Sequence, residues 1–107
     1  MALFSLPGIK ICGISAAVPK NRESNADYTW VSKKERESLI KNIGVETRRV
    51  ADKGTTTSDL CVIAAEKLMD DLRWERNEVE LLVFVSQSRD YLVPTTACIV
   101  QDRLGLP

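Results

Sequence analysis

The stretch 57–72, TSDLCVIAAEKLMDDL, constrains the fold more than any other part of this chain. Every fourth residue of 60–72 is apolar, so these residues share one face of a helix. Thr57 or Ser58 can supply the oxygen that caps its first turn. Further apolar residues at 61–65 widen that face. We therefore expect the first half of this helix to be buried between other layers.

Two short runs rich in β-branched residues lie on either side of the helix. GIKICGISAAV, residues 8–18, stops before Pro19, and a residue that precedes proline favours an extended conformation. Gly13 within it suggests close packing against another backbone or a large side chain. LLVFV, residues 81–85, is a continuous apolar run, which is typical of a strand covered on both faces. We expect both runs to be strands.

Other helices are expected before and after this central part. ERESLIKNI, residues 35–43, has apolar residues at helical spacing and precedes Gly44, a typical C-terminal residue of a helix. Residues 95–104 form another expected helix. Asn25 is a suitable N-cap, which predicts a short helix over 26–33.

The order of elements predicts the class of fold. Residues 45–51 suit a short strand or an extended loop, and residues 91–94 suit a loop. Strand, helices, strand and helix follow one another, which indicates an α/β protein with a parallel or mixed sheet covered by helices. The 107 residues suffice for one domain and not for two. A further strand should follow the last helix, so either the domain closes unusually or the chain is the N-terminal piece of something longer.

Composition argues against several kinds of partner. Fifteen basic and fifteen acidic residues give a formal net charge of zero, which does not favour nucleic acid or a charged membrane surface as a partner. The apolar runs are shorter than a membrane span. The first residues lack the pattern of a secretory signal. We expect a cytoplasmic protein that binds neither nucleic acid nor membrane.

The cysteines and the lack of histidine restrict the chemistry. The chain has three cysteines, no CxxC pair and no histidine, which argues against a disulfide framework, a zinc site and any internal Cys-His pair. Cys98 follows a Pro-Thr-Thr turn and lies beside Ile99 and Val100 in the expected last helix. We expect a buried, protonated, structural thiol there and not a nucleophile.

Five motifs in order resemble one protein family. The motifs are GIKICGISAAVP, SNADY, IGVETRRVA, TTSDLCVIAAEKL and ELLVFVSQSRDYLVPTTACIVQDRLGLP. The most specific parts are 43–49 and 93–105. With these motifs, over about residues 10–107, the chain resembles the opening third of β-ketoacyl-acyl carrier protein synthase III, a thiolase-fold condensing enzyme.

The resemblance implies that residues 1–107 are the N-terminal part of the first thiolase-like domain. The parent would be an acyltransferase of fatty-acid or related synthesis and a homodimer. It would take an acyl group from a coenzyme A or acyl carrier protein thioester onto a cysteine, and then condense it with malonyl-acyl carrier protein, without a permanently bound cofactor. The catalytic Cys, His and Asn of the family lie beyond Pro107. The resemblance therefore places no catalytic residue and no metal site in this chain.

The resemblance also points to residues near the acyl donor. A tryptophan that stacks on the adenine of coenzyme A and an arginine that helps to bind it are matched here by Ser38 and Asn42. Neither can stack on a purine or pair as a charge with phosphate, which leaves two carriers of the acyl donor to be distinguished, coenzyme A and a carrier protein. Trp30 could stack instead, or pack on its own helix. Arg48 could approach the cofactor's phosphates or an acidic helix of a carrier protein, or form an ion pair with a neighbour such as Glu46 or Asp52.

Val93 is the expected substrate-pocket residue. In the family, the residue before this proline reaches across the dimer and lines the partner's acyl pocket. A valine there leaves room for a longer or branched primer, although Val93 could equally be an ordinary loop residue.

Two rival functions remain open. The first is the same fold with different acyl chemistry, such as ester or amide formation or a 3-hydroxy-3-methylglutaryl-type condensation. The second is a non-catalytic α/β module that binds a partner.

Overall fold

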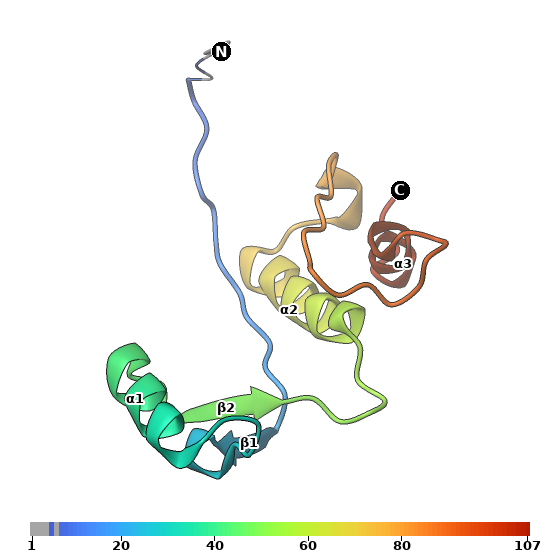
Figure 1. The fold of residues 1–107 in the computed structure, drawn as a ribbon. Helices are drawn as coiled ribbons and strands as arrows, with labels where there is room; N and C mark the ends of the chain where they lie inside the picture. Colours follow the sequence, from blue (N-terminus) through green and yellow to red (C-terminus); the bar gives the residue numbers. More distant parts are fainter. Residues whose placement is uncertain (1–4, 6) are drawn as a thin grey trace.

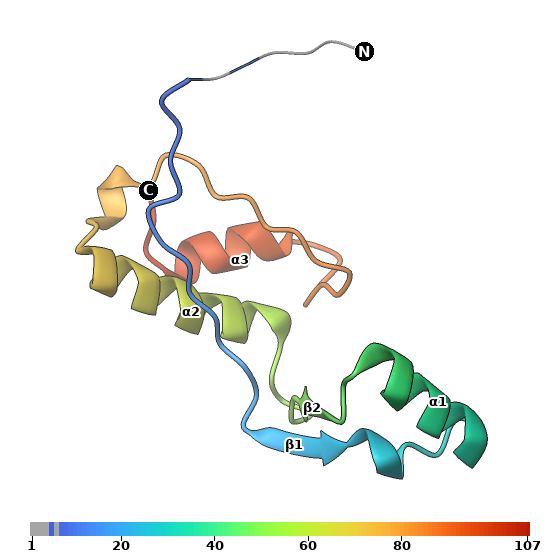
Figure 2. The same ribbon diagram turned by 90° about the vertical axis from the view of Figure 1, so that its left-hand side faces the viewer.

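The computed structural model describes residue 5 and residues 7–107, which form two groups of elements (Figure 1). α1 and a two-stranded sheet lie at one end, and α2 and α3 lie side by side at the other, as both ribbon views show (Figure 2). None of the described helices is long and apolar enough to cross a membrane. The elements are β1 Asn21–Ser24, η1 Asn25–Asp27, α1 Lys33–Ile43, β2 Thr47–Val50, α2 Thr57–Leu72, η2 Arg76–Glu78 and α3 Thr96–Arg103.

The two longest helices, α1 and α2, begin in the same way. In α1, Ser32 accepts from the backbone N–H of Glu35, and the Glu35 carboxylate accepts from the backbone N–H of Ser32. Thr56 and Asp59 form the same capping box at α2, so the N-cap is Thr56 and the expectation of Thr57 or Ser58 is wrong. Each box satisfies backbone donors that have no partner within the helix. These helices confirm the predictions for 35–43 and 57–72, and Gly44, with φ 75°, ends α1 as expected.

The buried core lies between α2, α3 and the segments beside them. Ile63 of α2 is exposed, so the expectation that the whole first half of this helix is buried is wrong on that face. The neighbours of α2 cover only its other side. The buried apolar residues are Val62, Met69, Val100, Leu104 and Leu106, and those packed partly against them are Cys61, Ala65, Val79, Leu82 and Phe84.

The described sheet is an antiparallel pair of strands, β1 and β2, which η1 and α1 separate in the sequence. Asn21 of β1 lies opposite Val50 of β2, and Ser24 lies opposite Thr47. β2 confirms the short strand expected over 45–51, whereas β1 was not predicted, because its sequence is wholly polar. The parallel pairing that the order of elements suggested is not formed among the described residues.

Two segments expected to be strands are extended but are not strands in the described part of the chain. Among the described residues, 8–18 and 81–85 have no backbone hydrogen-bond partners, and a strand requires a neighbour that shares its hydrogen bonds. Gly13 does pack closely as predicted, because a Cβ there would lie 2.8 Å from Cδ1 of Leu68. Residues 81–85 are covered on one face and not on both. Half-buried Leu82 and Phe84 alternate with exposed Leu81, Val83 and Val85.

The helix expected over 26–33 is also absent. Residues 25–27 form a single 3₁₀ turn whose N-cap is Ser24. Asn25 does not cap a helix, because its side chain donates to the carbonyl of Val45 at 2.9 Å and accepts from Arg48 at 2.6 Å. Hydrogen bonds with Val45 and Arg48, which are distant in the sequence, thus replace the local cap that the sequence suggested.

The chain leaves much apolar surface uncovered. Its radius of gyration is 18.5 Å, whereas a compact domain of this length has about 13 Å. Its accessible surface is 9330 Å², against about 6000 Å² expected for a compact monomer of this mass. The exposed faces of 8–18 and 81–85 contribute to this excess.

Candidate functional site

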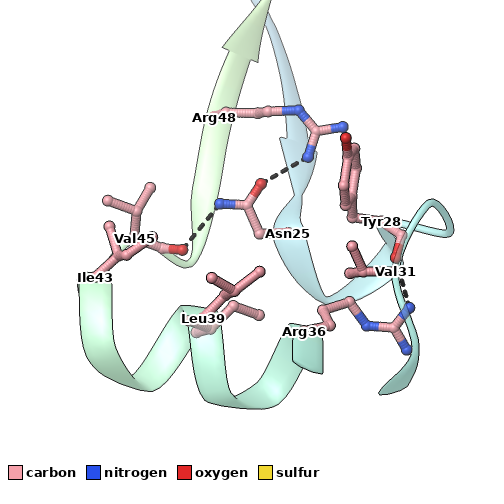
Figure 3. Close-up of a pocket in the computed structure, with 9 residues that line it drawn as sticks. Asn25, Tyr28, Val31, Arg36, Leu39, Ile43, Val45 and Arg48 are labelled. Carbon is pink, nitrogen blue, oxygen red and sulfur yellow. Dashed lines mark hydrogen bonds between the residues drawn. The ribbon is translucent and has the colours of Figure 1, made fainter. Parts of the chain in front are cut away.

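A pocket of about 460 Å³ lies between α1 and the two-stranded sheet (Figure 3). The apolar face of α1 forms its floor and the turn after η1 closes one side. A volume of this size is in the range of small-molecule sites. Its apolar lining residues are Val31, Leu39, Ile40, Ile43 and Val45, and its polar rim is formed by Asn25, Tyr28, Arg36 and Arg48.

The polar rim is already engaged in internal contacts. Arg48 is ion-paired with Glu23, donates to Asn25 at 2.6 Å and lies 5.2 Å from the ring centroid of Tyr28. Arg36 donates to the backbone carbonyl of Tyr28 at 2.6 Å. Arg48 is therefore ion-paired, as one of the two hypotheses held, but its partner is Glu23 and not Glu46 or Asp52. These contacts stiffen the rim and offset part of the charge of Arg48.

Ser38 and Asn42 lie one turn apart on α1, outside this pocket. Asn42 donates to the hydroxyl of Ser38 at 3.4 Å, and both residues are exposed. Ser38 instead borders a shallow hollow on the same helix, next to Val31. Trp30 is 87% exposed and does not pack on a helix, so it remains able to stack on a ligand. The structure thus brings Ser38 and Asn42 together, while Arg48 lies across the pocket on β2.

Val93 lies in the 88–95 loop that precedes α3, and it lines neither of the two hollows beside α1. This loop lies at the end of the molecule that holds α2 and α3 (Figure 1). The side chain of Val93 is 85% exposed, and the Val93–Pro94 peptide bond is cis. Tyr91 and Leu92 beside it are exposed too. The loop expected at 91–94 is confirmed, and its tip presents three apolar side chains to the surroundings.

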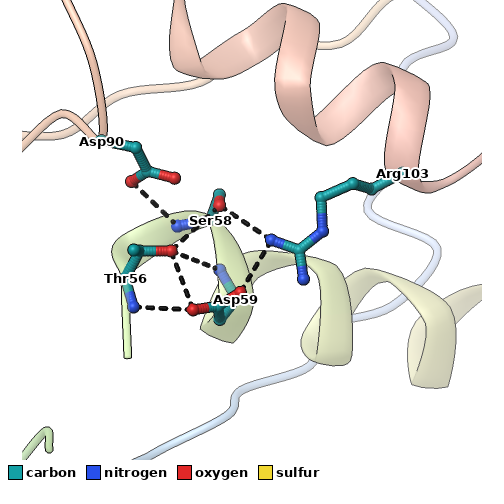
Figure 4. A network of polar contacts seen from close by, with 5 residues as sticks. All are labelled: Thr56, Ser58, Asp59, Asp90 and Arg103. Carbon is teal, nitrogen blue, oxygen red and sulfur yellow. Dashed lines mark hydrogen bonds and ion pairs between the residues drawn. The ribbon is translucent and has the colours of Figure 1, made fainter. Parts of the chain in front are cut away.

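A polar network lies at the base of that loop, where α2 meets α3 (Figure 4). We call it the Ser58 network; its members are Thr56, Ser58, Asp59, Asp90 and Arg103. Ser58 is only 1% exposed and accepts from Arg103 at 2.9 Å. Arg103 is also ion-paired with Asp59 at 2.8 Å. The backbone N–H of Ser58 donates to Asp90 at 3.4 Å.

Asp59 is the member of this network with a perturbed acidity. Hydrogen bonds from the backbone N–H and the hydroxyl of Thr56, and then from Arg103, hold the pKa of Asp59 below its usual value. Sequence reasoning recognised the helix start but not the network, because Arg103 lies 45 residues from Ser58. An arginine in the last turn of α3 was the one available signal.

Cys98 lies in α3 as predicted, but it is exposed, so the expected burial is wrong. The reason is that α3 buries its opposite side, which carries Val100 and Leu104. The hydroxyl of Thr95 lies 3.3 Å from the Cys98 sulfur. The chain holds no histidine that could activate this thiol. Within the part of the chain that the structure describes, no three His, Cys, Asp or Glu side chains gather as metal ligands.

Solved structures define the class of this fold. The 3-oxoacyl-(acyl-carrier protein) synthase of Burkholderia xenovorans LB400 is similar with a TM-score of 0.78 and 36% identity, over 88% of this chain and 28% of that one. A β-ketoacyl-[acyl carrier protein] synthase III from Thermus thermophilus gives a TM-score of 0.73 and 34% identity, over 90% of this chain and 30% of that one. The chain therefore has an α/β fold of the thiolase-like class.

Curated relatives name the family. The β-ketoacyl-[acyl-carrier-protein] synthase III of Syntrophomonas wolfei is 36% identical over 97 residues, which are 91% of this chain and 29% of that protein. The synthase III 2 of Bacillus subtilis is 32% identical over 96 residues, 90% of this chain and 30% of that protein. No family model matches the chain. The chain spans about three-tenths of the length of these relatives and is a segment of a β-ketoacyl-[acyl-carrier-protein] synthase III-like protein.

Proposed function

We propose that the protein containing this chain is a 3-oxoacyl-[acyl carrier protein] synthase III, an acyltransferase of fatty-acid or related acyl-chain synthesis. Similarity in both sequence and fold, over about nine-tenths of the chain, is the observation that carries this proposal. Residues 1–107 would be the N-terminal part of the first thiolase-like domain. The catalytic Cys, His and Asn would lie after Pro107.

The proposed reaction has two stages. A cysteine thiolate attacks the carbonyl of an acyl thioester, forms an acyl-enzyme and releases the donor thiol. Malonyl-acyl carrier protein then loses carbon dioxide, and the resulting carbanion attacks the acyl-enzyme carbonyl. The new carbon–carbon bond forms as the cysteine thiolate leaves. No permanently bound cofactor is needed in this scheme.

The residues of this chain would bind and shape, and would not react. We assign Ser38, Asn42 and Arg48 to the approach of the thioester donor and Val93 to the acyl pocket. Ser38 and Asn42 offer neutral hydrogen-bonding groups, which suit an amide-rich arm better than an adenine ring or a phosphate. The charge of Arg48 is partly offset by Glu23. These features favour acyl carrier protein over coenzyme A as the carrier of the primer.

The proposal includes assembly and location. A cytoplasmic homodimer that binds acyl carrier protein and acyl-coenzyme A, but neither nucleic acid nor membrane, fits the neutral net charge and the excess of exposed apolar surface. Burial of that surface against the rest of the protein and a second subunit would supply the core that the described segment lacks.

The direct test is a search for the acyl-enzyme. The protein from the complete reading frame is incubated with acyl-coenzyme A and acyl-carrier protein thioesters, and adducts are mapped by mass spectrometry. We expect an acyl group on a cysteine beyond Pro107, formed faster from the carrier protein. An adduct on Cys98 would contradict our reading of that residue, and no adduct would favour the non-catalytic module.

The role of Val93 has its own test. Val93→Phe narrows the proposed pocket, so the preferred primer should become shorter. Leu92→Phe is the control, because it introduces a phenyl ring of the same size at the neighbouring position of the loop. Condensation rates are measured over straight and branched primers. An unchanged chain-length profile for Val93→Phe would refute the pocket assignment.

A second candidate is a condensing enzyme with different acyl chemistry. The chain is similar to a tetronic acid condensing enzyme with a TM-score of 0.69 and 28% identity, over 87% of this chain and 30% of that one. Ser38 and Asn42 at the positions expected for tryptophan and arginine also favour a specialised donor. Mass analysis of the released product separates a 3-oxoacyl thioester from an ester, an amide or a ring product.

A further inference from the structure

The 88–95 loop combines an apolar tip with a polar base. Tyr91, Leu92 and Val93 are all exposed. Burial of apolar side chains against a protein surface lowers the free energy, so exposed ones favour folding back onto the molecule. A loop that projects three of them therefore needs a restraint at its base that keeps it extended. The contacts at the base of this loop provide that restraint.

The base is tied on both sides of the tip. Before the tip, the hydroxyls of Ser88 and Thr57 lie 2.9 Å apart, and Asp90 accepts from the backbone N–H of Ser58 at 3.4 Å. After the tip, the hydroxyl of the buried Thr96 accepts from the backbone N–H of Asp90 at 3.3 Å. Asp90 therefore joins the first turn of α2 to the first turn of α3, and the tip is the short segment closed between these contacts.

Arg103 fixes the turn to which Asp90 is bound. Its guanidinium reaches from the last turn of α3 and donates to Ser58 at 2.9 Å, beside its ion pair with Asp59 (Figure 4). Ser58 is buried, so its contacts are shielded from water and hold one geometry. The start of α2, both ends of the loop and the end of α3 thus form one connected unit.

We propose that Asp90, Ser58 and Arg103 are positioning residues that hold the 88–95 loop and thereby set which acyl primers are accepted. This rests on the proposed function, because it acts through Val93 as a wall of the acyl pocket. A merely structural role would affect stability alone. A positioning role also changes the choice of primer, and a variant that keeps the hydrogen bond restores that choice.

The first part of the test measures order in the loop. Hydrogen exchange is compared among the wild type, Asp90→Ala, Asp90→Asn and Asp71→Ala in the complete protein. Asp90→Ala removes the acceptor and should speed exchange of the 88–95 amides about tenfold. Asp90→Asn keeps an oxygen acceptor and should exchange like the wild type. Asp71→Ala removes a carboxylate that is ion-paired with exposed Lys67, far from the loop in sequence, and should leave the loop unchanged.

The second part measures primer choice. Asp90→Ala should reduce the preference between the best primer and one two carbons shorter about fivefold. It should also weaken the effect of Val93→Phe, whereas Asp90→Asn should leave both as in the wild type. A lower melting temperature with an unchanged primer profile would overturn the proposal.

The two parts separate this proposal from the proposed function. Loop exchange that does not differ between Asp90→Ala and the wild type overturns the positioning role whatever the activity. A wild type that forms no acyl-enzyme refutes the proposed function, and with it the effect on primers, while exchange still decides whether Asp90 orders the loop. Faster exchange together with an altered primer profile supports both.

Discussion

Two regions of the molecule start from similar local signals but differ in how far their side chains are buried. The first, residues 20–51, contains α1 and the β1–β2 sheet, and the second, residues 55–107, contains α2 and α3. Both contain a helix that begins with a capping box. Yet all the buried apolar residues that the structure describes lie in the second region, and no residue of 20–51 is buried. A well-capped helix therefore forms from local sequence, but a core requires a second apolar surface to cover it.

The two regions also differ in what stabilises them. Burial of a large aliphatic side chain contributes about 1.5–3 kcal/mol, and the α2–α3 region has several such residues. The first region relies on contacts such as Asn25 with Val45 and Arg36 with Tyr28, each worth about 0.5–1.5 kcal/mol net. Its apolar side chains instead surround an open pocket.

The largest expected effect is that of a cavity in the α2–α3 core. Leu104 is 2% exposed. Leu104→Ala should therefore lower the free energy of unfolding by about 2–5 kcal/mol. Leu39→Ala is the matched change in the other region. Because Leu39 is 46% exposed, its loss should cost about 1 kcal/mol. Urea unfolding of the protein from the complete reading frame measures both.

An equal loss for the two variants would break this comparison. It would mean that residues outside this segment fill the pocket beside Leu39 in the complete protein. Leu92→Ala, on the exposed loop tip, is a control for the loss of leucine from a surface.

An intermediate effect is expected from the caps. Thr56→Ala and Ser32→Ala each remove a capping hydroxyl and should each cost about 1 kcal/mol. Since Thr56 belongs to the Ser58 network, its loss should speed hydrogen exchange in α2 and also at the start of α3. Ser32→Ala should affect α1 alone. Exchange that spreads equally from both sites would contradict the idea that only one region is connected through a core.

The smallest effect concerns acid pH. The backbone N–H and hydroxyl of Thr56 and the Arg103 guanidinium lower the pKa of Asp59, while the Ser32 hydroxyl and backbone N–H lower the pKa of Glu35. A carboxyl whose pKa is lower in the folded state stabilises that state above its unfolded pKa, about 3.9 for Asp and 4.3 for Glu. This contribution is lost as the pH falls through the lower folded value.

Asp59→Asn should therefore flatten the loss of global stability below about pH 4. Glu35→Gln should change only the acid fraying of α1, because its hydrogen-bond partner lies within its own helix cap. Circular dichroism and amide exchange across pH 2–7 compare the two variants. Identical acid profiles for Asp59→Asn and the wild type would show that Arg103 and Thr56 do not select the ionised carboxyl.

Particular residues show how far prediction from sequence reached in the fold. The bounds of α2, the glycine that ends α1 and the close packing at Gly13 were all predictable, because periodicity, caps and small residues act locally. The strands expected at 8–18 and 81–85 did not form, since pairing depends on a partner distant in sequence. The helix expected after Asn25 failed for the same reason, because Val45 and Arg48 bind its side chain.

The candidate site was less predictable than the fold. Ser38, Asn42, Arg48 and Val93 were identified by resemblance, and their roles remain predictions. The partner of Arg48 lies 25 residues away, which no local pattern indicates. The exposure of Cys98 depends on which face α3 turns toward α2.

The sequence by itself determined α1, α2 and α3, the glycine that ends α1 and the kinship with β-ketoacyl synthase III, because these depend on residue types at short, regular spacing. Only the tertiary structure decided which faces are covered, which charges are paired and how the Ser58 network ties the 88–95 loop to two helices. Burial and long-range hydrogen bonds join residues tens of positions apart, and their geometry exists only once the chain has folded.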